Sequence, residues 1–134
     1  MADELLCTVT DYVNAVRAQI QDTGVPPRYA DADIVLGFNM MLLEARRLRA
    51  DLFVTKWGNR VPSYAANNGE EVPMEPQFRL GFVYGAAAYV LTYDMEDVND
   101  ARANAFMNVF HAIMTGVSTP PIQGGTPAAG SPQK

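Results

Sequence analysis

The stretch Asp31–Phe53, DADIVLGFNMMLLEARRLRADLF, constrains the fold most, because it is the longest segment with clear helical periodicity. Apolar residues recur there at steps of three and four, which places them on one face of a helix. A second apolar set lies on the opposite side of the same helix. Such a helix needs neighbours on more than one side, supplied by the rest of the chain or by another copy of it. The first set is Ile34, Phe38, Met41, Ala45, Leu48 and Leu52, and the second is Leu36, Met40 and Leu43.

Charged residues mark the ends of this helix, predicted over residues 31–50. Asp31 or Asp33 is expected to cap its first turn, because a carboxylate accepts hydrogen bonds from free backbone amides. Arg46, Arg47 and Arg49 lie in the last turns. Positive charge there complements the helix dipole, so we expect these arginines to serve the dipole and salt bridges between subunits.

Three further helices are predicted over residues 9–21, 76–94 and 99–115. Thr8 or Thr10 is expected to cap the first, with Gly24 as its stop. Pro76 suits the first position of the third helix, after Glu75 as its cap. The last helix is expected to begin after Asp97 or Asn99 and to end at Gly116. The pattern predicts an all-α four-helix bundle with little or no sheet, a long loop between the second and third helices, and an extended C-terminal tail.

The predicted core follows from the apolar stripes of the four helices. In the third helix Gly81 and Gly85 share a face, although Gly costs about 1 kcal/mol against Ala inside a helix. They indicate close approach of another backbone, within the bundle or across a subunit boundary, and internal packing is the simpler cause. The predicted core residues are Val13, Val16, Phe38, Met41, Ala45, Val83, Ala87, Phe106 and Val109.

The segment from Val54 to Pro73 is rich in Gly, Pro and Asn and predicts a loop. A weak hairpin is the alternative, with residues 53–57 paired to residues 60–64. The only tryptophan, Trp57, lies here with Arg60 and Tyr64. Trp, Tyr and Arg are typical of interfaces, so we expect the loop to project and contact a partner. The other interpretation is that Trp57 folds back over the open end of the bundle.

The last 18 residues, VSTPPIQGGTPAAGSPQK, contain four prolines, three glycines and no aromatic residue. A segment of this composition cannot form a packed core. We therefore divide the chain into a helical domain, 1–116, and a tail, 117–134. The tail is expected to run extended over a partner protein, with Pro120, Pro121 and Ile122 in the contact.

Composition limits the possible functions. With 134 residues, 49% of them hydrophobic, the chain suits one domain with a core. The formal charge of −5 disfavours a surface that grips nucleic acid, which requires Lys and Arg. The single cysteine, Cys7, excludes an intrachain disulfide. No secretory signal and no membrane-spanning run are visible.

The sequence contains no motif typical of a catalytic site. There is no metal-binding pair of Cys or His, no phosphate-binding Gly-rich loop and no nucleophile elbow. His111, the only histidine, is expected to be an ordinary half-exposed helix residue. The sequence therefore predicts neither a catalytic site nor a cofactor or metal site, and favours a protein that is not an enzyme.

Three segments resemble the head-to-tail adaptor (connector) proteins of tailed bacteriophages. They are ARRLRADLF, VPMEPQFRLGFVYGAAAYVLTYD and MEDVNDARANAFMNVF, and the resemblance covers residues 8–116. Within them, Arg49, Asp51, Leu52 and Phe53 form one short motif, and Glu96, Asp97 and Asn99 form another.

The resemblance implies a structural virion protein made in the bacterial cytoplasm and located at the head-tail junction. It implies a ring of identical subunits, a dodecamer in such adaptors, between a portal protein and a tail or nozzle protein. The ring extends the channel through which double-stranded DNA passes without specific binding. No membrane is involved. The alternatives are another head- or tail-completion protein and a small helical enzyme or binding module.

Overall fold

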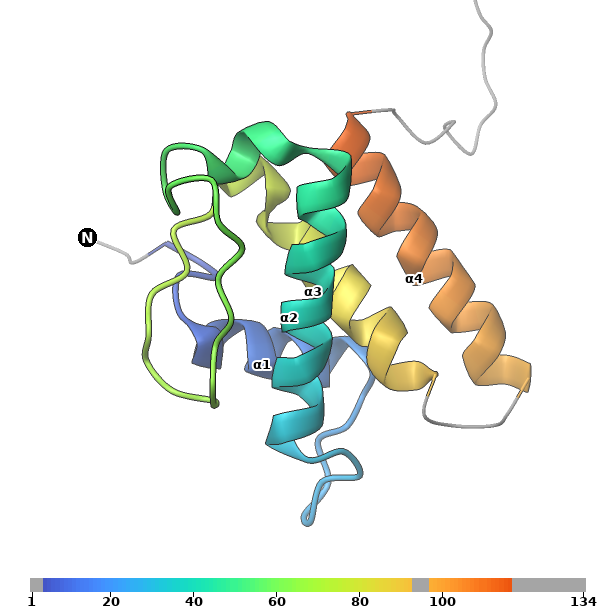
Figure 1. Cartoon of the computed structure of the whole chain (residues 1–134). Helices are drawn as coiled ribbons and strands as arrows, with labels where there is room; N and C mark the ends of the chain where they lie inside the picture. Colours follow the sequence, from blue (N-terminus) through green and yellow to red (C-terminus); the bar gives the residue numbers. More distant parts are fainter. Residues whose placement is uncertain (1–3, 93–96, 117–134) are drawn as a thin grey trace, which may run out of the picture.

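The computed structural model describes residues 4–92 and 97–116, and the side chains of 97–99 are excluded from the description. The helices are α1 (Val9–Gln19), α2 (Asp31–Leu48), the short 3-10 helix η1 (Ala50–Phe53), α3 (Pro76–Leu91) and α4 (Asp97–Thr115), as Figure 1 shows. The described part contains no strand, only an isolated bridge between Thr8 and Glu71. The predicted all-α bundle is therefore confirmed. The predicted tail, 117–134, lies outside the described residues.

The helix at the centre of the bundle is α3, and not α2, although α2 has the clearer helical periodicity in the sequence. α3 packs against α1, α2 and α4, and runs behind α2 in the view of Figure 1. Ten of its 16 residues are buried. A helix buried nearly all round has no single apolar stripe, so its central position is hard to recognise from periodicity.

Seven of the nine predicted core residues are buried, and two on α4 are not. Phe106 and Val109 are only half-buried, while Phe110 and Met114 are fully buried. The face of α4 that meets α3 is therefore centred on Phe110 and Met114, and not on Phe106 and Val109. Phe106 lies at its edge, with its ring 5.4 Å from that of Tyr84. The correctly predicted residues are Val13, Val16, Phe38, Met41, Ala45, Val83 and Ala87.

The two glycines of α3 allow α2 and α4 to approach closely, as the internal-packing interpretation predicted. A Cβ atom on Gly81 would lie 2.9 Å from the terminal methyl of Met114. A Cβ atom on Gly85 would lie 2.7 Å from the sulfur of Met41 and 2.9 Å from the Phe110 ring. These distances are shorter than van der Waals contact, so any larger residue must displace its neighbours.

The helix starts match the prediction in part. Thr8 caps α1 in a capping box with Asp11, as predicted. The cap residue of α2 is Ala30, without a side-chain hydrogen bond, so neither Asp31 nor Asp33 is the cap. Asp31 instead accepts hydrogen bonds from Arg17, at 2.5 Å, and from Asn67, at 3.0 Å. Glu75 precedes α3 as predicted, but makes no capping hydrogen bond.

The chain leaves α1 earlier than Gly24, which was expected to end it. The helix ends at Gln19, and Gln21 adopts a positive φ of 60°. The buried carboxylate of Asp22 then holds the turn. It accepts hydrogen bonds from Arg17 at 2.7 Å and from the backbone amides of Arg28 at 2.6 Å and Tyr29 at 3.0 Å. Asp22 thus positions the start of α2.

At the C-terminal end of the described chain, Gly116 ends α4 with φ of 75°, as predicted.

Candidate functional site

The outward face of α2 carries three large apolar side chains in adjacent turns. Leu36, Met40 and Leu43 have 43%, 38% and 55% of their surface exposed. Single exposed apolar residues are ordinary, whereas a contiguous stripe is typical of an interaction surface. The stripe is the second apolar set of the sequence pattern. Its exposure confirms that the bundle does not cover both sides of α2.

A groove of about 410 Å³ adjoins this stripe. Helices α2, α3 and α4 all contribute to it, so it is a product of the fold and not of one segment. Its floor and walls are mainly apolar, with methionine prominent. Methionine is flexible and polarizable, and suits surfaces that must accommodate a partner. The lining residues are Met40, Met41, Leu43, Glu44, Arg47, Tyr89, Met107 and His111.

The charged side chains that line the groove pair with one another. Glu44 forms an ion pair with Arg47, and its carboxylate lies 3.3 Å from Nε2 of His111. The hydrogen bond from Arg47 lowers the pKa of Glu44, and His111 adds to this effect, whereas partial burial opposes it. The groove therefore suits an uncharged apolar occupant better than a basic one. His111 is half-exposed, as predicted.

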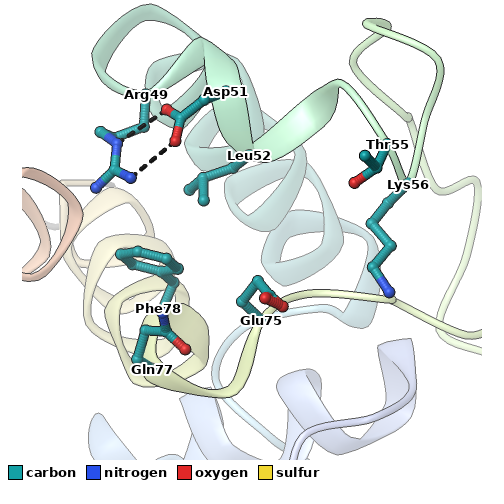
Figure 2. Close-up of a pocket in the computed structure, with 8 residues that line it drawn as sticks. All are labelled: Arg49, Asp51, Leu52, Thr55, Lys56, Glu75, Gln77 and Phe78. Carbon is teal, nitrogen blue, oxygen red and sulfur yellow. Dashed lines mark hydrogen bonds and ion pairs between the residues drawn. The ribbon is translucent and has the colours of Figure 1, made fainter.

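The motif Arg49, Asp51, Leu52 and Phe53 forms a junction at one end of the bundle, and Figure 2 draws the first three of these side chains. The guanidinium of Arg49 donates to both carboxylate oxygens of Asp51, at 2.9 and 2.8 Å. It also donates to the backbone carbonyl of Met114 at 2.9 Å and lies 5.1 Å from the centre of the Phe78 ring. The hydrogen bonds from Arg49 lower the pKa of Asp51. One side chain thus ties together η1 and the ends of α3 and α4.

A second cavity, of about 420 Å³, lies beside this junction and is lined by both acidic and basic side chains. Figure 2 shows Lys56 and Glu75 on the side away from the Arg49–Asp51 pair. The mixed charges give no preference for an anion or a cation. Arg46 and Arg47, the other arginines of the cluster, contact Asn59 and Glu44 within the chain.

The loop 54–73 packs on its own bundle, so the prediction that it projects is wrong. The backbone of Tyr64 exchanges two hydrogen bonds with the side chain of Asn39: the Asn39 amide donates at 2.8 Å and accepts at 2.9 Å. Further along, the amides of Val9 and Val72 donate to the carbonyls of Glu70, at 3.0 Å, and Cys7, at 2.8 Å. The predicted hairpin does not form in this described segment: the amides of Asn59 and Arg60 donate locally, to the carbonyls of Phe53 at 2.8 Å and Trp57 at 3.0 Å.

Of the residues expected to contact a partner, the structure describes Trp57, Arg60 and Tyr64. Tyr64 is 5% exposed and belongs to the core, where its ring lies 5.9 Å from that of Phe38. Trp57 is half-buried and packs on Phe53, with ring centres 5.1 Å apart, which agrees with the interpretation that it folds back. Arg60 is exposed. Pro120, Pro121 and Ile122 lie outside the described residues.

Sequence reasoning missed the residues that hold the loops and the N-terminal segment. Asn39, a polar residue inside an apolar helix, was a partial signal for a buried hydrogen-bonding role. Arg79 was not recognised. It donates to the carbonyl of Met74 at 2.8 Å, the carbonyl of Leu5 at 3.0 Å and the carboxylate of Glu4 at 2.8 Å. Its partners lie up to 75 residues away, so no local pattern reveals them.

Comparisons with known proteins give no match: no family model, no curated protein and no solved structure resembles the chain significantly.

Within the described residues, no three His, Cys, Asp or Glu side chains gather in a way that would hold a metal ion. In the same part of the chain, no helix has both the length and the apolar character needed to cross a membrane.

Proposed function

We propose that this chain is a structural head-to-tail adaptor of a tailed bacteriophage. Identical copies form a ring between the portal protein and the tail, and the ring extends the DNA channel. The observation that carries the proposal is the uncovered stripe of Leu36, Met40 and Leu43 with its adjoining groove. A bundle that leaves such a stripe exposed on the 18-residue helix α2 is suited to an assembled state.

A ring requires two different contact surfaces on each subunit, since heterologous contacts close into a ring when the rotation per subunit allows it. The stripe and its groove supply one of these surfaces. The acidic balance of the chain agrees with a channel through which DNA slides without being held. The resemblance of residues 8–116 to phage adaptors supplies the particular place in the virion.

The test is the mass of the purified protein, alone and with its portal, for wild type and two matched variants. Leu43→Ser changes the stripe, whereas Leu80→Ser changes a leucine of similar exposure, 51%, on α3. We expect Leu43→Ser to weaken ring formation on the portal by at least about tenfold, since burying a leucine contributes about 1.5–3 kcal/mol. Leu80→Ser should assemble as wild type does.

Helical content must stay unchanged in both variants, which is expected because both side chains are exposed. A protein that stays a monomer with the portal present contradicts the adaptor function. A ring of unchanged stability in Leu43→Ser would instead move the subunit contact away from α2. Assembly of wild type on a tail protein without any portal would favour a different completion protein.

A further inference from the structure

The groove between α2 and α4 lies close to the point where the described chain ends. His111 and Met107, which line it, precede Gly116 by five and nine residues on the same helix. At a rise of 1.5 Å per residue these side chains lie about 8 and 14 Å back along the axis of α4. In Figure 1 the C-terminal ends of α2 and α4 lie near each other, and Arg49 joins them by its bond to Met114.

The segment that follows has the length and character to fill this groove. An extended chain advances about 3.1–3.5 Å per residue, so residues 117–122 span about 20 Å. Ile122, the only large apolar residue after Val117, is therefore within reach of Met107 and Met40. The left-handed conformation of Gly116 ends the helix and permits the chain to change direction there.

The absence of charge in the segment also suits the apolar groove. From residue 117 to residue 133 the sequence contains no charged side chain. The groove is mainly apolar, and Glu44, its acidic residue, is already paired with Arg47 and close to His111. An uncharged segment enters without breaking that pair. A basic or acidic partner would have to compete with it, at a desolvation cost that an apolar segment avoids.

We propose that residues 117–122 of the same chain bind in this groove in the isolated protein, with Ile122 against Met40, Leu43 and Met107. A short tether gives an effective concentration in the millimolar range, so a contact with a dissociation constant below that range is well populated. The contact is also easily displaced by a partner that binds the tail more strongly.

If the proposed function holds, the contact controls assembly. The tail covers the stripe that a neighbouring subunit needs, and capture of the tail by the portal uncovers it. Subunits then associate on the portal and not in free solution. This consequence rests on the adaptor proposal, whereas the contact between tail and groove does not.

The test is disulfide trapping in the isolated full-length protein, in a Cys7→Ser background so that only the introduced pair reacts. One variant combines Ile122→Cys with Met40→Cys. The control combines Ile122→Cys with Leu80→Cys, which is 51% exposed on α3 and does not line the groove. Leu80 precedes Gly81, where an added Cβ would lie 2.9 Å from the Met114 side chain near the end of α4, so the segment can reach Leu80 without entering the groove. Both partner positions are exposed, so both variants are expected to fold, which circular dichroism checks.

We expect the Met40 pair to form an intramolecular bond at least about tenfold faster than the Leu80 pair, because a bound segment has the higher local concentration. Equal rates would overturn the proposal. So would a predominantly dimeric product, which would assign the groove to the tail of another copy. Since no portal is present, the outcome is independent of the ring assay with Leu43→Ser, and either proposal can fail alone.

Discussion

Asn39→Ala is the substitution that best tests how the long loop is held. The Asn39 side chain binds both the amide and the carbonyl of Tyr64, 25 residues along the chain. Alanine removes both hydrogen bonds and leaves two backbone groups of a buried residue unpaired. Asn39 also lies next to Phe38, so loss of this contact releases the loop beside the centre of the core.

The magnitude follows from the two bonds. A neutral hydrogen bond contributes about 1 kcal/mol net, and an unpaired buried group costs about 1–3 kcal/mol. Two such groups, partly accessible to water once the loop relaxes, give about 2–4 kcal/mol. Alanine returns about 0.5 kcal/mol as the better helix former. We therefore expect the free energy of unfolding to fall by about 2–3 kcal/mol, a large share of the usual 5–15 kcal/mol.

Urea unfolding followed by circular dichroism measures this loss, and hydrogen exchange at the Tyr64 amide reports the loop directly. Asn104→Ala is the matched control: the same exchange in a helix, at an exposed position of α4. It should leave stability unchanged or raise it by up to about 0.5 kcal/mol. Equal unfolding free energies for the two variants would refute the assignment of Asn39 as the anchor of the loop.

Two further perturbations address packing and charge. Gly85→Ala should lower the free energy of unfolding by about 1–2 kcal/mol in thermal melts, because the new methyl overlaps Met41 and Phe110. Gly69→Ala is the control: this residue has open space around it, so the substitution should change the free energy of unfolding by less than about 0.5 kcal/mol. The pKa of Glu44 lies below its ordinary 4.5 in the folded state, so its stabilising contribution is present above pH 4.5 and is lost as pH falls through the folded pKa. Glu44→Gln should therefore lose less stability than wild type on acidification below pH 4.5, and identical acid titrations of stability would contradict the role of its pairing with Arg47.

The inward stripe of α2 was predictable because Ile34, Phe38 and Met41 recur at helical spacing, and all three are buried in the core. The outward stripe was predictable for the same reason, and with it the groove's apolar side. The burial of Tyr64 was not, since its amide finds a partner on α2 that no local pattern indicates. On α4 two apolar faces compete, and only the position of α3 decides in favour of Phe110 over Val109.

The Arg49 junction has a practical consequence for experiments at the C-terminus. Because its guanidinium grips the Met114 carbonyl from another part of the chain, the last turn of α4 is anchored against fraying. A fluorophore or fusion attached beyond Gly116 is therefore attached to a helix end that does not fray. Its movement then reports on the segment that follows and not on unwinding of the helix. In an Arg49→Ala background the hydrogen bond to Met114 is lost, and the same label then also reports fraying of the last turn of α4.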